Sequence, residues 1–146
     1  MKPLELIDQL NSQIKVGFST MIWGPPGIGK SQIVGKVAKD NEYKLLDIRL
    51  STKAPEDIHG LPMFKGERTI WTKSDIFPEE GVKTLLFFDE ITHADGRLRK
   101  AAFQIILDRQ IGKYKLPDDT VIFAAGNRVE DRSGPQPMEL ALKNRF

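Results

Sequence analysis

Cysteine, long hydrophobic runs and net charge are all scarce or absent in this sequence of 146 residues. Without cysteine there are no disulfides and no thiolate metal ligands, which suits a reducing compartment such as the cytoplasm. No apolar run approaches the roughly 20 residues that cross a bilayer, and the N-terminal segment is amphipathic, unlike the core of a signal peptide. The formal net charge of +2 gives no support for binding to nucleic acid or to a membrane. We therefore expect a soluble, cytoplasmic protein.

What the sequence does contain is an alternation of strand-like and helix-like segments. Apolar residues predict strands over 18–23, 44–50, 84–88 and 120–125, and a hairpin over 61–72. Helical spacing predicts amphipathic helices near the N-terminus, after residue 31, after Asp95 and over 137–143. This alternation predicts one domain, residues 1–146, with an α/β fold in which helices cover a mostly parallel sheet.

A glycine-rich loop lies between the first predicted strand and the helix that follows it. It matches the phosphate-binding pattern G-x-x-x-x-G-K-[ST] and reads Gly24-Pro25-Pro26-Gly27-Ile28-Gly29-Lys30-Ser31. Glycines let backbone N–H groups turn inward around phosphates, and the next helix adds the positive end of its dipole. Lys30 is expected to contact the β- and γ-phosphates, and the Ser31 hydroxyl to bind Mg²⁺. A chance match in a glycine- and proline-rich turn is the alternative.

Two acids follow the apolar run that ends at Phe88. In open α/β sheets, ligands bind at the carboxyl ends of the strands, where Asp89 and Glu90 are expected to lie. Asp89 would hold Mg²⁺, and Glu90 would accept a proton from the attacking water. Adjacent acids at the end of a strand also occur in solvated turns, but the phosphate loop upstream favours the catalytic interpretation.

A polar side chain also follows the strand predicted over 120–125. Asn127 comes after Gly126, and its amide could donate to a γ-phosphate or orient a water without adding charge. The alternative is an asparagine that simply forms a turn.

These motifs together resemble the large subdomain of an AAA+ ATPase. GPPGIGKS resembles the Walker A motif, LLFFDE the Walker B motif and AAGN the sensor 1 strand. The stretches DIHGLP and ALKNRF resemble the MoxR and dynein-related (midasin-like) branch. The resemblance implies a P-loop NTPase three-layer sandwich with strand order 5-1-4-3-2, ATP and Mg²⁺ as ligands, and ATP hydrolysis. It also implies a ring, commonly hexameric, that remodels a protein partner.

The C-terminal part of the sequence offers a candidate arginine finger but is not expected to contain the family's fifth strand and lid. Arg145 resembles the arginine finger that reaches a neighbouring subunit's γ-phosphate. Arg128 and Arg132 could also take that role. The structural alternative for Arg145 is an exposed arginine that interacts with the dipole at a helix end. The fifth strand and the helical lid of the family are not expected within these residues. The chain would then be a truncated core, and its first strand would have an unpaired edge.

Several other features are open to two interpretations. The hairpin over 61–72 resembles the insertion that lines the pore in related rings, but Phe64 and Trp71 could equally form a small satellite core. His59 and His93 lack partners at metal-binding spacing, so we expect surface or packing roles. The basic residues Arg97, Arg99 and Lys100 fit the solvated side of a helix.

Three other functions compete with a mechanochemical ATPase that acts on proteins. A phosphotransferase would share the phosphate loop, but Glu90 beside Asp89 and the sensor-like Asn127 favour water activation. A nucleotide-dependent assembly module without hydrolysis is favoured by the missing lid. A DNA-loading or helicase role receives no support from the small net charge.

Overall fold

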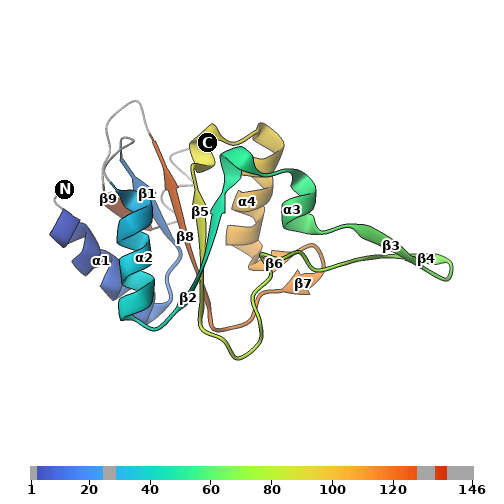
Figure 1. The fold of residues 1–146 in the computed structure, drawn as a ribbon, viewed down its shortest axis with the longest axis horizontal. Helices are drawn as coiled ribbons and strands as arrows, with labels where there is room; N and C mark the ends of the chain where they lie inside the picture. The colour runs from blue at the N-terminus through green and yellow to red at the C-terminus, as the bar shows by residue number, and fades with distance from the viewer. Residues whose placement is uncertain (1–2, 25–28, 128–133, 138–146) are drawn as a thin grey trace.

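The computed structural model describes residues 3–24, 29–127 and 134–137, which form three layers (Figure 1). The helices α1 (Pro3–Val16) and α2 (Lys30–Asp40) cover one face of the central sheet. The opposite face is covered by α4 (Gly96–Asp108) and the short helix α3 (Pro55–His59). The predicted α/β sandwich is therefore confirmed.

Four parallel strands form the centre of the sheet. They are β1 (Thr20–Trp23), β2 (Lys44–Arg49), β5 (Thr84–Asp89) and β8 (Thr120–Gly126). With β9 (Gly134–Pro137) beside β1, the sheet order is β2-β5-β8-β1-β9. Numbered along the chain within this sheet alone, the strands read 5-1-4-3-2 from β9 to β2, which is the order implied by the resemblance.

The two central strands explain why their sequences carry almost no polar residues. Every residue of β5 and β8 is buried. Along β5, Phe87 packs toward α1 and α2, whereas Phe88 packs toward α4. A strand covered on both faces needs apolar side chains at successive positions, because its side chains alternate between the two faces. Such strands hold the residues that follow them in fixed positions.

Three of the predicted helices coincide with α1, α2 and α4, whereas α3 was not predicted. Asp95 precedes α4, and its carboxylate accepts a hydrogen bond from the Arg97 amide at 2.8 Å. This is the predicted N-cap, which satisfies one of the amides left unpaired at the start of a helix. Among the described residues, no helix is both long and apolar enough to cross a bilayer.

The expectation of an unpaired edge on the first strand is wrong. Strand β9 pairs antiparallel with β1, so a fifth strand is present at the position where none was expected. Backbone groups at a sheet edge are stabilised by a pairing segment, and proline is tolerated there because one side of an edge strand needs no donor. The helix predicted over 137–143 begins at a residue of β9 and otherwise lies outside the described residues.

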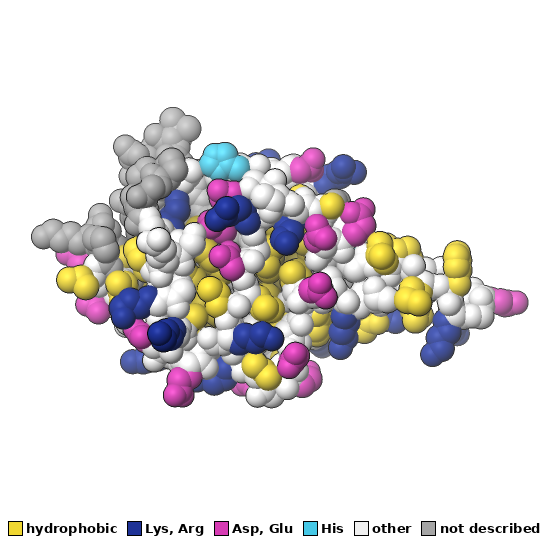
Figure 2. Space-filling model, in the orientation of Figure 1, with side chains coloured by type: hydrophobic (Ala, Val, Ile, Leu, Met, Phe, Trp, Pro, Cys, Tyr) yellow, Lys and Arg dark blue, Asp and Glu magenta, His cyan; other side chains and the backbone are white. Residues whose placement is uncertain are grey.

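Two small hairpins lie outside the main sheet. The first, β3 (Pro62–Lys65) with β4 (Arg68–Trp71), confirms the predicted hairpin, and Gly66 in its turn has a φ of 65°. The second, β6 (Gln110–Ile111) with β7 (Tyr114–Lys115), was not predicted. In Figure 1 the β3–β4 hairpin projects from the body of the molecule, and Figure 2 shows hydrophobic side chains on the surface of this arm.

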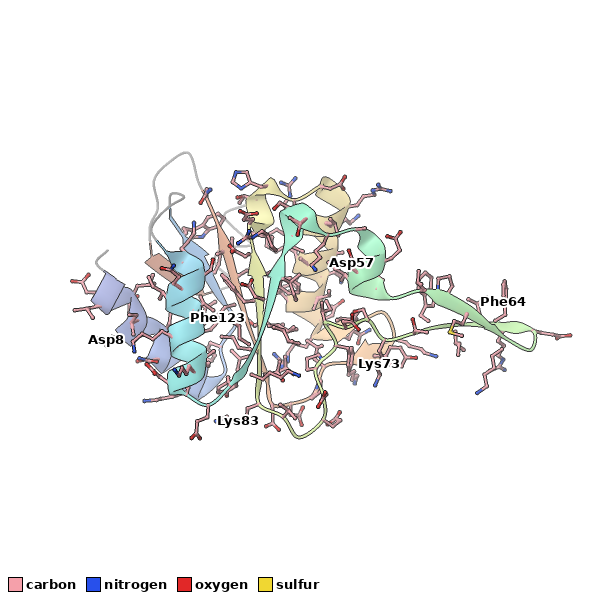
Figure 3. All side chains as sticks on the ribbon, viewed as in Figure 1. Asp8, Asp57, Phe64, Lys73, Lys83 and Phe123 are labelled. Atoms are coloured by element: carbon pink, nitrogen blue, oxygen red, sulfur yellow. The ribbon has the colours of Figure 1, made fainter. Side chains whose placement is uncertain are left out.

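The satellite core suggested for the β3–β4 hairpin is wrong. Phe64 is 90% exposed and Trp71 is 48% exposed. Figure 3 shows Phe64 near the far end of the hairpin, away from the sheet. The hairpin is too narrow to cover its own apolar side chains, and a two-stranded hairpin needs another layer for that.

Candidate functional site

A pocket of about 390 Å³ lies at the carboxyl edge of the parallel strands, where open α/β sheets bind ligands. The start of α2 and the segments that follow β2, β5 and β8 bring polar groups to it. Its lining residues are Gly29, Lys30, Ser31, Gln32, Arg49, Asp89, Glu90, Ala125, Gly126 and Asn127. The structure therefore brings together the described candidate residues from all three sequence motifs.

The end of the phosphate-loop motif adopts a backbone conformation that explains the glycine before Lys30. Gly29 has φ 77° and ψ 31°, a left-handed conformation that a residue with a Cβ adopts at a cost. Its carbonyl accepts from the Ile33 amide at 3.0 Å, which begins α2. At the start of the motif, the Gly24 amide donates to the Gly126 carbonyl at 3.2 Å. Pro25, Pro26, Gly27 and Ile28 lie outside the described residues.

Lys30 points across the pocket toward the end of β8. Its Nζ donates to the Gly24 carbonyl at 2.6 Å, the Asn127 Oδ1 at 2.7 Å and the Gly126 carbonyl at 3.4 Å. Burial lowers the pKa of Lys30 below its usual value, and the Asp89 and Glu90 carboxylates partly oppose that shift. The ammonium is thus held by neutral acceptors, an arrangement suited to receiving an anion.

Ser31 and Asp89 meet directly. The Ser31 Oγ donates to the Asp89 Oδ2 at 2.9 Å, although the two residues are 58 positions apart in the chain. Asp89 is only 6% exposed, and its other oxygen accepts from the Glu90 amide at 2.8 Å. One hydroxyl beside one carboxylate fits Mg²⁺, which favours oxygen ligands and keeps waters and phosphate oxygens in its shell. Within the described residues, no group of three or more His, Cys, Asp or Glu side chains is placed to hold a metal ion.

Glu90 differs from Asp89 in its exposure and in its hydrogen-bond partners. Its backbone is left-handed, with φ 57° and ψ 38°, so the chain turns sharply at the end of β5 into the short 3-10 helix Ile91–His93. The carboxylate accepts from the Ser51 hydroxyl, and its Oε2 lies 4.0 Å from the Arg49 Nε. Asp89 is buried, whereas the Glu90 side chain is 42% exposed. The two carboxylates thus differ in how far they are buried and in which residues they contact.

Ser51 and Arg49 were missed by the sequence analysis. Both belong to the end of β2 and the turn after it, and β2 is paired with β5 so that Arg49 lies beside Asp89. The available signal was positional: β2 is another parallel strand, and its carboxyl end must reach the same edge of the sheet.

Asn127 is held by hydrogen bonds from both its side chain and its backbone amide. Its side-chain Oδ1 accepts from Lys30, and its backbone amide donates to the Thr92 Oγ1 at 3.0 Å. A Cβ at the preceding residue, Gly126, would lie 2.7 Å from the Thr92 Cγ2. Only glycine lets β8 pass this close to the segment after β5. Thr92 is a third residue that the sequence analysis missed.

Among the described residues, the two histidines considered in the sequence analysis do not line this pocket. Arg145, Arg128 and Arg132 lie outside the described residues. His59 and His93 are both exposed. His59 borders the base of the β3–β4 hairpin next to Trp71, away from the pocket.

The fold and the grouping of these motifs define the class: a phosphate-loop nucleotide-binding domain of the AAA+ type. The model of the AAA domain family, dynein-related subfamily, matches residues 19–146. The chain belongs to that family. A search of curated proteins found no significant match.

Solved structures with the same fold agree with this assignment. A candidate ATPase from Cytophaga hutchinsonii is 19% identical, with a TM-score of 0.60, over 99% of this chain and 44% of that one. A RuvB variant from Thermotoga maritima is 16% identical, with a TM-score of 0.56, over 86% of this chain and 38% of that one. NtrX from Brucella abortus in complex with ADP is 16% identical, with a TM-score of 0.56, over 97% of this chain and 30% of that one. This chain therefore spans less than half the length of each.

Proposed function

We propose that this chain binds Mg-ATP in the pocket at the carboxyl edge of the sheet and hydrolyses it when assembled with further copies. The observation that carries the proposal is the convergence of Lys30, Ser31, Asp89, Glu90 and Asn127 on one pocket of about 390 Å³. They come from three separate segments of the chain. A family of ATPases and a structural relative that holds ADP support the choice of ligand.

Lys30 and the start of α2 would bind the phosphates. Lys30 is partly buried and its ammonium has three acceptors that are all neutral, so a phosphate oxygen can replace one of them with a gain in charge attraction. No side-chain cap is described at the beginning of α2, which leaves this helix end open to an anion. Asn127, released from Lys30, would then be free to donate its amide to the terminal phosphate.

Ser31 and Asp89 would hold Mg²⁺, which neutralises charge on the phosphates when it is bound. Glu90 is better placed than Asp89 to face an attacking water, because its side chain is 42% exposed, whereas Asp89 is buried and bonded to the Ser31 hydroxyl. Ser51 and Arg49 hold the Glu90 carboxylate at the rim of the pocket, where a water can approach it.

Assembly and partner are proposed from the family resemblance. Residues 1–146 would be the nucleotide-binding core of a ring-forming protein whose helical lid lies outside this segment. Arg145 would act as the finger toward a neighbouring copy, where a cation stabilises the charge that develops on the phosphates. Mixing Arg145→Ala subunits with Lys30→Ala subunits should restore part of the activity, because some interfaces then contain both working parts. A mixture that assembles and stays inactive would move the role to Arg132 or Arg128.

A MoxR-like role in remodelling a protein partner has one structural support. The β3–β4 hairpin exposes Phe64 and Met63 well away from the nucleotide pocket, and exposed apolar side chains mark surfaces that contact other molecules. The hairpin is thus the best candidate for contact with a protein partner.

Hydrolysis is tested with Glu90→Gln. The amide keeps the size of the side chain but accepts a proton poorly, so turnover should fall by about 10²- to 10⁴-fold while Mg-ATP affinity is retained. Calorimetric titration measures binding, and phosphate release measures turnover. Glu80→Gln, which changes an exposed acid away from the pocket, is the matched control. Unchanged turnover would contradict the proposed base, and binding without any turnover in the wild type would favour a non-hydrolysing assembly module.

A further inference from the structure

Helix α1 carries an exposed stripe on the side that faces away from the sheet. Leu4 is 76% exposed and Val16 is 63% exposed, although both are large apolar residues. The stripe recurs at helical spacing and consists of Leu4, Asp8, Ser12, Lys15 and Val16, all exposed. In Figure 3 the Asp8 side chain points away from the body of the protein. Leu4 and Val16 thus leave apolar surface in water near both ends of the helix.

Helix α4 carries a second exposed stripe on the opposite side of the molecule. It consists of Gly96, Lys100, Gln104, Leu107 and Asp108, again at helical spacing and all exposed. Leu107 is 61% exposed. A hollow of about 340 Å³ follows this side of the helix, from Gly96 past Lys100 to Leu107. No Cβ contact would arise at Gly96, so another helix can come close there.

The two stripes are complementary when the helices are aligned in parallel. The helices have nearly equal lengths, with 14 residues in α1 and 13 in α4. With Leu4 placed beside Gly96, Asp8 falls beside Lys100 and Ser12 beside Gln104. By the same offset, Lys15 and Val16 fall at the level of Leu107 and Asp108, so Val16 reaches Leu107, and Lys15 reaches Asp108, one position along the helix. A large residue meets a glycine, each charge meets its opposite, and the apolar ends meet each other.

The antiparallel alignment lacks this complementarity. It brings Lys15 toward Arg97 and Lys100 at the start of α4, so like charges would face each other. The two central charges are available for a partner, because neither Asp8 nor Lys100 forms an ion pair within the described residues. The Asp108 carboxylate, in contrast, accepts a hydrogen bond from Gln104 Nε2. Charge complementarity therefore favours one orientation of the two helices.

We propose that α1 of one copy packs in parallel against α4 of the next copy, with Asp8 facing Lys100 and Val16 facing Leu107. This inference rests on the proposed assembly of copies and names the surfaces that form it. Because α1 and α4 cover opposite faces of the sheet, each copy uses one helix toward each neighbour, which is the head-to-tail contact that closes into rings. In Figure 1 both helices run from the upper to the lower part of the view. Rotation about an axis along that direction keeps them parallel between neighbours.

Charge reversal tests the contact in the full-length protein. Asp8→Lys and Lys100→Glu should each raise the concentration needed for half-maximal assembly by at least about fivefold, because each replaces an attraction with a repulsion. The double variant restores opposite charges across every interface and should assemble close to wild type. Sedimentation velocity with Mg-ATP measures assembly, and Lys39→Glu, at an exposed position on α2, is the control for charge alone.

The outcomes separate this inference from the proposed function. If the wild type assembles and both single variants assemble equally well, the helix contact is wrong and the proposed ATPase stands. If the wild type binds Mg-ATP but does not assemble at any accessible concentration, the proposed assembly fails and the inference fails with it. Calorimetric titration of Mg-ATP, expected to be unchanged in all three variants, shows that the pocket remains folded.

A second measurement tests the parallel orientation. The chain contains no cysteine, so Asp8→Cys and Lys100→Cys introduce the only thiols in this segment. Mild oxidation of the doubly substituted protein should link copies into chains and closed rings through residues 8 and 100. Pairing Lys15→Cys with Lys100→Cys is the matched control. Faster cross-linking of the control pair would overturn the parallel register.

Discussion

The carboxyl edge of the sheet and the β3–β4 hairpin fix their side chains by different means. At the sheet edge, buried strands end in polar residues that bond to one another, as Ser31 does to Asp89 and Lys30 to Asn127. At the hairpin, all eight strand residues are exposed or nearly so, and Phe64 is in contact mainly with solvent. The apolar core therefore positions polar groups at the edge, whereas the hairpin presents apolar groups with no core of its own.

The hairpin is nevertheless firmly attached at its base. The Thr72 amide donates to the Leu61 carbonyl at 3.0 Å, and the Tyr114 hydroxyl donates to the Trp71 carbonyl at 2.9 Å. The second contact comes from the β6–β7 hairpin. Lys73 Nζ lies 4.6 Å from the centre of the Phe77 ring, which itself packs edge-to-face on Tyr114. The hairpin thus combines a base that is held by hydrogen bonds with exposed apolar side chains beyond it, which suits a surface that contacts another molecule.

The largest expected difference between the two regions is the loss of stability when a phenylalanine is replaced by alanine. Phe87→Ala, in the strand that delivers Asp89, should lower the free energy of unfolding by about 3–5 kcal/mol, because it leaves a cavity among fully buried side chains. Phe64→Ala, in the exposed hairpin, should change it by less than about 0.5 kcal/mol. Urea denaturation measures both. Equal losses would show that the hairpin is packed against something in solution.

The next effect concerns binding at the sheet edge. Lys30→Ala should weaken Mg-ATP binding by about a hundredfold, because a charge-assisted contact to phosphate is lost from a partly desolvated site. Lys36→Ala removes a lysine from the exposed side of the same helix, where it pairs with Asp40 at 3.0 Å, and should change affinity by less than about twofold. Calorimetric titration compares them. Similar losses in both variants would show that Lys30 acts through the helix and not through the phosphates.

A smaller effect tests how the hairpin is attached. Gly60 has φ 79° and ψ −167°, and a Cβ there would lie 2.0 Å from the Thr72 carbonyl oxygen. Gly60→Ala should therefore cost about 2–3 kcal/mol of stability in the hairpin base. Gly66→Ala in the turn meets no atom within 4 Å and should cost only about 1 kcal/mol, from its positive φ alone. Hydrogen exchange of the β3 and β4 amides checks the difference, and equal protection in the two variants would contradict it.

The smallest effect is the pH dependence that Lys30 gives to the nucleotide-free protein. Burial lowers the pKa of Lys30 below its usual value of 10.5, so between the two values the unfolded state binds more protons than the folded state. The cost of burying the charge is fully present below the folded pKa and disappears as the pH rises toward 10.5. The stability of the wild type relative to Lys30→Met should therefore rise with alkaline pH. Urea denaturation at several pH values measures this, and a falling difference would contradict the sign.

Local sequence patterns predicted the main sheet and the main polar groups of the site. Buried parallel strands have apolar runs, and their polar ends meet at one edge, so Asp89, Glu90 and Asn127 could be assigned to a common site with Lys30 and Ser31. The left-handed glycine at position 29 and the cap at Asp95 are likewise local, because each depends on a few neighbouring residues. The agreement of the strands and of the Asp95 cap with their predictions follows from short-range physics, whereas the catalytic roles of the site residues stay predictions.

Only the tertiary structure decided the contacts made across the chain. Ser51 and Thr92 belong to no motif, and their hydrogen bonds to Glu90 and Asn127 arise because separate strand ends converge. The antiparallel pairing of β9 with β1 likewise joins segments that are more than 100 residues apart. The sequence by itself determined the four parallel strands, the β3–β4 hairpin and the helices α1, α2 and α4, through periodicity, glycine and capping. Which surface groups meet, and which of them stay exposed, depends on long-range packing that no local pattern encodes.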